Sequence, residues 1–383
     1  MSVIAWIFLI SMVGRASAPA QEPVVKQIEF STDGGNLSTL GEVLIEYADG
    51  SNLLLTPDGQ LHTLRAEDIQ SEEPSDVPMT PLTPDEMGQA VVAELPEGFK
   101  VLQTKHYVLV YNSSEIYVNW VGRLFERQYS VFYNYWKSRG IRLNEPRFPL
   151  VAIVFSDKAS YMPYAKREVG EAAESMIGYY NMKTNRMATY DLTGVDGLVP
   201  NGSRISSQAV IDELISRPEY ERTVATIAHE AVHQLSFNGG LQTRLAENPR
   251  WLSEGMAMFF EAPDSGSASG KQRVGNVNYH NLRLFVSQFK DRPADSLSTL
   301  ISDDSRMINA ATASRAYPES WALTYFLFKT KSKQCTKYLL ELRDLPPLGE
   351  VSPRERVERF KKHFGEDLTQ LDTEFINYMR RVR

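Results

Sequence analysis

The sequence predicts an α+β protein, in which a small β-sheet module precedes one larger domain that begins with strands and ends in helices. Alternating apolar and polar residues separated by Asp-Gly turns occur before residue 70, and a Pro-rich acidic stretch without periodicity follows. From Glu219 onward, apolar residues recur at helical spacing. The 383 residues suit roughly two domains. We therefore expect a β module at 24–70, a linker at 71–84 and the larger domain at 85–383.

Composition limits the classes of protein. With 42% hydrophobic and 23% charged residues, the chain is typical of a soluble, ordered protein. The single cysteine, Cys335, excludes an internal disulfide framework and a cysteine-based zinc site, and its Leu-rich surroundings predict a buried thiol. Residues 1–100 carry 16 acidic and 4 basic side chains, whereas the other 283 residues carry 32 acidic and 37 basic ones. Neither part contains a Lys- or Arg-rich run, so we expect no nucleic-acid partner.

The first twenty residues resemble a secretory signal peptide. Val3 to Val13 is an apolar stretch, and the small residues Ala16-Ser17-Ala18 follow it. This stretch is shorter than the roughly 20 residues that a membrane-spanning helix needs, and no other stretch approaches that length. No Lys or Arg precedes the apolar run, which departs from the usual pattern. We expect cleavage of 1–20 and an exported protein with no transmembrane segment afterwards.

The β module is predicted as a three-stranded meander. Its strands are Glu42–Tyr47, Ser51–Leu55 and Gln60–Leu64. The turns between them contain Asp49-Gly50 and Asp58-Gly59, and Asp-Gly between alternating runs is a strong hairpin signal. A meander this small is marginal alone, so we expect it to pack on a larger part of the chain.

The larger domain begins with a capping box at Thr83–Glu86, which predicts a helix with Pro84 in its first turn. Four further elements are predicted from periodicity: a strand at 101–111, a long helix at 114–138, a buried strand at 149–155 and a hairpin at 176–192 that turns at Thr184-Asn185. Residues 193–216 are expected to form an inserted loop with a short helix, and residues 264–270 a second loop.

The strongest functional signal is the sequence His229-Glu230-Ala231-Val232-His233, an HExxH motif. No Pro or Gly occurs from Glu219 to Asn238, so the motif should lie in a helix, where residues four apart share one face. Both imidazoles can then bind one zinc ion, with Glu230 beside them as a general base. Alternatively, the two histidines simply satisfy a polar core.

A third ligand is offered by Glu254. Asn248 and Pro249 are typical helix-start residues, so Glu254 should lie in the second turn of a new helix. Its carboxylate could complete a His, His, Glu set with the fourth position open, which is the pattern of a catalytic rather than a structural zinc site. A glutamate near a helix N-terminus can also simply face solvent.

These residues support a resemblance. HEAVH followed by WLSEGMA resembles the gluzincin branch of the HExxH metallopeptidases, which implies a zincin-like fold, peptidase chemistry, Zn2+ as cofactor and His229, His233 and Glu254 as its ligands. Residues 99–383 also resemble a family of exported bacterial proteins known only as a domain of unknown function, through Ile177-Gly178-Tyr179-Tyr180, Thr184-Asn185-Arg186, TVATIAHEAVHQLSFNGGL, WLSEGMAMFFE and the stretch Tyr317 to Leu323. That second resemblance implies no particular substrate.

The chain departs from these relatives in two ways. The Gly-x-Met-Glu-Asn motif with which zinc aminopeptidases hold a substrate amino terminus is absent. Met258 stands where thermolysin-like enzymes carry an aspartate that orients a histidine, so the histidine must be oriented from elsewhere or less firmly.

An oxyanion donor is also needed for amide hydrolysis. Tyr317 follows Glu254 at a separation similar to that of the tyrosine in zinc aminopeptidases, and His280 and Tyr279 are rival donors. Tyr317 could instead be a core aromatic, and the other two could be surface or capping residues. In zincins an edge strand pairs with the substrate backbone, and the hairpin at 176–192 is the candidate for that role.

The leading hypothesis is therefore an exported zinc metalloprotease that acts on a protein or peptide substrate. His229, His233 and Glu254 would hold the metal, Glu230 would be the general base, and Tyr317 or His280 would stabilise the oxyanion. The alternative is a non-catalytic binding or scaffold protein on a degenerate zincin fold. A metal-dependent hydrolase that acts on a non-peptide bond is a third reading, because HExxH activates water whatever the substrate.

Overall fold

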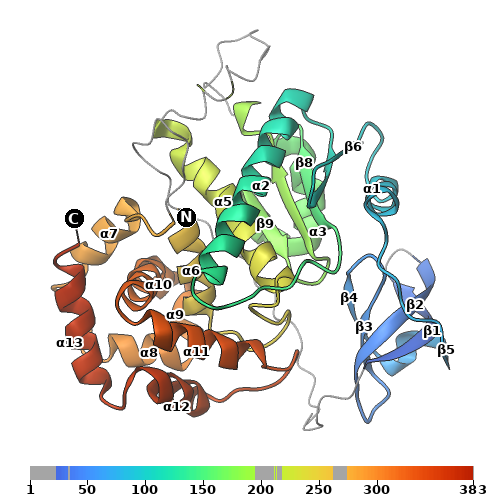
Figure 1. Ribbon diagram of the computed structural model, residues 1–383. Coiled ribbons are helices and arrows are strands. Elements are labelled where there is room, and N and C mark those ends of the chain that lie inside the picture. Colours follow the sequence, from blue (N-terminus) through green and yellow to red (C-terminus); the bar gives the residue numbers. More distant parts are fainter. Residues whose placement is uncertain are drawn as a thin grey trace. The chain divides into compact units, whose positions relative to one another are not determined.

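The computed structural model describes residues 23–32, 35–194, 211, 213, 218–261 and 274–382. The predicted signal peptide at 1–20, nearly all of the predicted insertion at 193–216 and the predicted loop at 264–270 lie outside these ranges. The architecture is α+β, as predicted, with a small N-terminal sheet and a helical C-terminal part (Figure 1). The chain forms two compact units, one built from residues 3–122 and 146–208 and the other from residues 123–145 and 209–383.

The N-terminal sheet has five strands rather than the three expected. Its strand order is β4-β3-β2-β1-β5, and the strands are β1 (Val24–Thr32), β2 (Gly35–Glu46), β3 (Asn52–Leu55), β4 (Leu61–Leu64) and β5 (Ile69–Pro74). All pairings are antiparallel. Alternate residues of β1, Ile28 and Phe30, are buried with Val43, Leu54 and Leu64 in a small core. β5 takes up the first residues of the expected linker, and Pro74 is tolerated because β5 is an edge strand.

The second sheet belongs to the same compact unit and has the strand order β6-β7-β8-β10-β9. Its strands are β6 (Lys100–Gln103), β7 (Tyr107–Tyr111), β8 (Leu150–Phe155), β9 (Gly178–Asn181) and β10 (Arg186–Tyr190). β7, β8 and β10 are parallel, while β6 and β9 are antiparallel edges. Every residue of β8 is buried, as its unbroken apolar sequence predicts.

The single strand predicted at 101–111 is wrong. The segment forms a hairpin, β6 and β7, because the polar residues Thr104 to His106 turn the chain, with the Thr104 N–H donating to Tyr107 O at 2.9 Å. The predicted hairpin at 176–192 is confirmed as β9 and β10. Its turn holds Asn185 at a φ of 60°, a left-handed conformation that asparagine tolerates better than most residues.

The helices of the sheet unit include α1 (Pro84–Ala93), α3 (Lys158–Val169) and the first part of α2 (Glu115–Lys137). The capping box predicted for α1 is present: Glu86 N donates to Thr83 Oγ1, and Thr83 N donates to the Glu86 carboxylate. Short 3₁₀ segments occur at 66–68, 170–175 and 192–194. In the described chain, no helix combines the length and the apolar character needed to cross a membrane.

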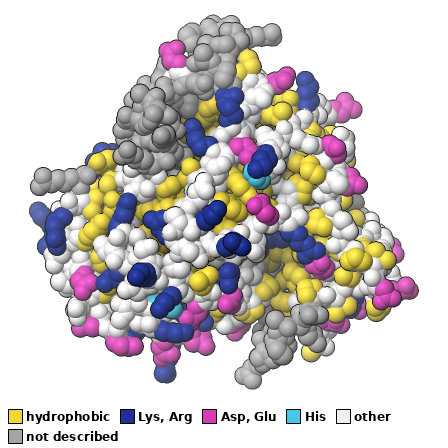
Figure 2. All heavy atoms as spheres, viewed as in Figure 1, with side chains coloured by type: hydrophobic (Ala, Val, Ile, Leu, Met, Phe, Trp, Pro, Cys, Tyr) yellow, Lys and Arg dark blue, Asp and Glu magenta, His cyan; other side chains and the backbone are white. Residues whose placement is uncertain are grey.

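The helical unit contains the rest of α2 and every helix after residue 217. These helices are α5 (Pro218–Asn238), α6 (Arg250–Phe260), α7 (Tyr279–Ser287), α8 (Ser296–Ser302), α9 (Ser305–Ile308), α10 (Ala310–Thr330), α11 (Ser332–Arg343), α12 (Pro353–Phe364) and α13 (Leu368–Met379). Cys335, on α11, is 5% exposed, so its prediction as a buried thiol is confirmed. On the surface drawn in Figure 2, Lys and Arg side chains occur among acidic and apolar ones.

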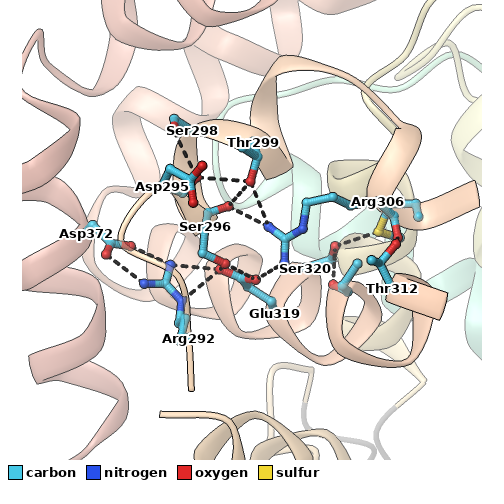
Figure 3. Close-up of polar contacts among 12 residues, drawn as sticks. Arg292, Asp295, Ser296, Ser298, Thr299, Arg306, Thr312, Glu319, Ser320 and Asp372 are labelled. Carbon is cyan, nitrogen blue, oxygen red and sulfur yellow. Dashed lines mark hydrogen bonds and ion pairs between the residues drawn. The ribbon is translucent and has the colours of Figure 1, made fainter. Parts of the chain in front are cut away.

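A buried glutamate organises several of these helices. Glu319 on α10 is 1% exposed, and its carboxylate accepts hydrogen bonds from Arg292, Arg306 and Ser296 at 2.6–2.9 Å (Figure 3). Arg292 also pairs with Asp372 of α13 at 2.6 Å. The guanidinium groups of Arg292 and Arg306 surround the Glu319 carboxylate, and Arg292 also contacts the carboxylate of Asp372, so the buried charges are compensated. These contacts connect α8, α9, α10 and α13.

Candidate metal centre

The two histidines of the HExxH motif lie one turn apart on α5, as the helical spacing predicts. His229 is 7% exposed and His233 is 3% exposed, and their ring centroids are 4.9 Å apart. The helix ends at the predicted Asn238-Gly239-Gly240 stop, where Gly240 has a φ of 68°.

Glu254 is presented by α6, a helix whose residues are all buried. The helix begins after Pro249, and the first N–H group, that of Arg250, donates to the Asp304 carboxylate at 3.0 Å rather than to an N-cap side chain. Arg356 also donates to Asp304, at 2.9 Å. Glu254 itself is fully buried in the second turn, so the reading of a solvent-facing glutamate is wrong.

Three buried polar side chains connect α5 to α6. Ser236 of α5 donates to the Gln242 side-chain oxygen at 2.8 Å, and the Gln242 amide nitrogen donates to Ser253 Oγ at 2.6 Å. Because Ser253 directly precedes Glu254, this chain of hydrogen bonds fixes the register of the two helices that carry the predicted ligands.

The three predicted ligands converge. Their candidate ligand atoms all lie within 4.8 Å of one another. His229 Nε2 is 3.2 Å from Glu254 Oε2, and His233 Nε2 is 3.7 Å from Glu254 Oε1. Neither ring nitrogen of His233 forms a hydrogen bond with a described residue. Glu254 Oε1 likewise accepts no hydrogen bond from a described residue. Buried polar atoms left in this way are costly, and a cation between them would satisfy them, so the group could hold a metal ion.

The electrostatics of the group suit a cation position. Burial alone disfavours a charged imidazole, but hydrogen bonds to Glu254 and Glu261 outweigh it and raise the pKa of His229 well above its ordinary value. Burial lowers the pKa of His233 to about 4, with the charges of His229 and Arg250 acting in the same direction. Burial would raise the pKa of Glu254, yet His229 and His233 hold it below its ordinary value. The two carboxylates therefore favour positive charge at this position.

Glu261 is a member of the site that the sequence reasoning missed. Its Oε2 lies 2.6 Å from His229 Nδ1, and its Oε1 accepts a hydrogen bond from Asn278 Nδ2 at 3.0 Å. The sequence comparison with thermolysin-like enzymes places a histidine-orienting carboxylate four residues after Glu254, where this chain has Met258. Glu261 stands seven residues after Glu254, two helical turns along the same face, and that spacing is the signal that could have identified it.

Glu230 and Tyr317 lie close to the group. Glu230 is 1% exposed on α5. Burial raises the pKa of the Tyr317 hydroxyl well above its ordinary range, and the negative charges of Glu254 and Glu230 raise it further, while Arg250 lowers it. Tyr317, in the second turn of α10, thus lies in the electric field of both carboxylates.

The rival donors lie at the start of α7. Tyr279 is 49% exposed, and His280 is partly buried. Asn278, just before them, is the helix cap that contacts Glu261. In the hairpin predicted to bind a substrate backbone, β9 is an edge strand of the second sheet.

Comparison with known families agrees with the predicted resemblance to a domain of unknown function. A family model described as "Protein of unknown function (DUF1570)" matches residues 223–349. The matched region contains His229, His233, Glu254 and Tyr317. No curated protein matches the chain.

Proposed function

We propose that the protein is an exported zinc-dependent metallopeptidase of the gluzincin type, with a zincin-like fold. The observation that carries the proposal is the buried group of His229, His233 and Glu254, in which three candidate ligand atoms converge. Within this group, His233 Nε2 and Glu254 Oε1 make no hydrogen bond to a described residue. Two imidazoles and one carboxylate form the donor set of catalytic zinc sites, which leave one position for water or substrate.

Zinc in this position would supply Lewis acidity, which polarises a scissile carbonyl group and makes water a better nucleophile at neutral pH. The remaining chemistry falls to the protein. Glu230, buried beside His229, is suited to take a proton from the attacking water and to return it to the leaving amine.

Tyr317 is the proposed oxyanion donor. Because its pKa is raised by burial and by the charges of Glu254 and Glu230, the hydroxyl keeps its proton at neutral pH and can donate a hydrogen bond to a developing negative charge. His280 remains the rival donor, because it lies two residues after Asn278, which contacts Glu261 of the site.

The proposal is tested first by metal content. We expect about one zinc per chain in the purified protein, by inductively coupled plasma mass spectrometry, and less in His229→Ala and Glu254→Ala. A folded wild-type protein that contains no zinc and takes up none would contradict the proposal and favour the non-catalytic scaffold.

Glu230→Gln tests the chemistry separately from the metal. We expect this variant to keep its zinc and to lose peptide hydrolysis, measured on a substrate first selected with the wild-type protein from a mixed peptide library. Hydrolysis at the wild-type rate would exclude Glu230 as the base. Zinc binding without hydrolysis of any peptide by the wild-type protein would again favour the scaffold.

A further inference from the structure

The two ring nitrogens of His229 face two different carboxylates. Nε2 lies 3.2 Å from Glu254 Oε2, on the side of the candidate metal position, whereas Nδ1 lies 2.6 Å from Glu261 Oε2. The ring is therefore held from both sides, and the roles of its nitrogens are distinct. His233 differs from it, because no described residue makes a hydrogen bond to its Nδ1.

Glu261 is itself held in place. Its Oε1 accepts from Asn278 Nδ2 at 3.0 Å, and the other end of that amide, Oδ1, accepts from the backbone N–H of Asn281 at 3.1 Å. Asn278 is the N-cap of α7 and is 9% exposed. The backbone N–H can only donate, so the amide oxygen must face it, and the amide NH2 is left to face Glu261. The orientation of Glu261 is thus set by the start of α7.

The same turn of α7 also contacts the residue that occupies the usual buttress position. Asn281 Nδ2 donates to Met258 Sδ at 3.4 Å. Met258 cannot accept a strong hydrogen bond from an imidazole N–H, whereas the Glu261 carboxylate can. Glu261, the residue directly after the last turn of α6, therefore makes the contact that Met258 cannot make.

We propose that Glu261, held by Asn278, is the positioning residue of the metal site: it accepts the Nδ1–H of His229, which leaves Nε2 unprotonated and directed at the metal. This inference rests on the proposed metal site and adds a residue to it. A carboxylate behind a metal-binding histidine fixes the tautomer and the ring orientation and makes the ligand more basic, and its loss typically costs about 10–100-fold in metal affinity.

The test measures zinc affinity by competition with a chromophoric chelator in the full chain. We expect Glu261→Ala to bind zinc about 10–100-fold more weakly than the wild type. Glu261→Gln should lose less, because its amide oxygen can still accept the N–H but carries no charge. Asn278→Ala should lose affinity in the same direction. Glu358→Gln, in an exposed ion pair on α12, is the matched control and should bind zinc like the wild type.

A second readout separates positioning from folding. The visible absorption spectrum of the Co2+-loaded protein reports ligand geometry, and it should change in Glu261→Ala and Glu261→Gln even where thermal unfolding of the metal-free variants matches the wild type. Wild-type zinc affinity and an unchanged Co2+ spectrum in both Glu261 variants would overturn the positioning role and leave the metal site standing. Absence of zinc binding in the wild type would overturn the site and this role together.

Discussion

In Tyr317, the hydroxyl is the group proposed for catalysis, whereas the ring contributes to packing. The Tyr317→Phe substitution removes the hydroxyl and keeps the ring, so we expect kcat to fall about 10²–10³-fold, the usual cost of one oxyanion donor. Zinc content and KM should stay near the wild-type values, because the hydroxyl is not a predicted ligand. The measurement is steady-state hydrolysis of the selected peptide. An unchanged kcat in Tyr317→Phe together with a fall in His280→Ala would transfer the role to His280.

His62 makes the sheet unit sensitive to acid. Burial against Phe30, whose ring centroid is 5.2 Å away, lowers the pKa of His62 below its ordinary value, and Arg186 acts in the same direction while Asp58 opposes it. The unfolded chain therefore binds the proton at a higher pH than the folded one. The stability that His62 contributes is retained above about pH 6.5 and is lost as the pH falls toward the folded-state pKa. The loss is about 1.4 kcal/mol for each pH unit by which the folded-state pKa lies below the ordinary value.

We expect the wild-type urea midpoint to fall more between pH 8 and pH 5 than that of His62→Gln, which cannot titrate. The comparison cancels the carboxylates common to both proteins. Equal falls in the two proteins would show that His62 titrates alike in the folded and unfolded states.

The residues of the site differ in how visible they are in a sequence. His229 and His233 follow from local helical spacing, and Glu254 follows from a short motif on the next helix. Glu261 is less visible, because its seven-residue spacing from Glu254 belongs to no known motif and Asn278, the partner that orients it, belongs to a different helix. Contacts within a helix can be predicted from periodicity, whereas a contact between helices can be predicted only where a recognisable motif places its residues.

At the scale of elements, α6 and α10 approach so closely that only glycine fits at position 255. A Cβ atom there would lie 2.1 Å from Thr324 Oγ1 and 2.5 Å from the backbone oxygen of Ser320. The backbone atom cannot move aside without shifting α10. The motif that carries Glu254 thus contains a glycine because two buried helices meet beside the ligand.

Gly255→Ala should destabilise the protein by about 1–3 kcal/mol, the usual cost of overpacking a core, and weaken zinc binding because Glu254 is the adjacent residue. Gly122→Ala in α2 is the control, since its Cβ would meet only side-chain carbons, the nearest 3.0 Å away. Chemical denaturation and chelator competition measure the two effects. A Gly255→Ala protein as stable as Gly122→Ala would show that the helices can separate at little cost.

Elements with strong local patterns were predicted well, and long-range pairings were not. The helix at 114–138 and the buried strand at 149–155 match α2 and β8. The N-terminal sheet gained β5, which pairs with β1 although some forty residues separate them along the chain. Such a pairing depends on the packed Ile28 and Phe30 rather than on any turn signal, so a search for hairpins does not find it.

At the largest scale, the helical unit contains a buried charge network as well as an apolar core. Glu319 lies two residues after Tyr317 on α10, and the arginines that surround it come from the segments before α8 and within α9 (Figure 3). This network and the metal group therefore share one helix. The residues that fix α10 also fix the proposed oxyanion donor.

Glu319→Ala leaves Arg292 and Arg306 without their buried carboxylate, so we expect a loss of about 3–5 kcal/mol in the free energy of unfolding. Glu358→Ala removes an exposed carboxylate from the i,i+4 pair with Arg354 and should leave the free energy of unfolding nearly unchanged. Urea denaturation of both variants supplies the comparison. Equal small losses would mean that Asp372 is a sufficient partner for Arg292 and that Ser296 and Thr299 are sufficient partners for Arg306. Apolar packing rather than Glu319 would then hold α10. A large loss for Glu319→Ala only would show that the stability of the helical unit depends on α10, the helix that also carries Tyr317, the proposed oxyanion donor.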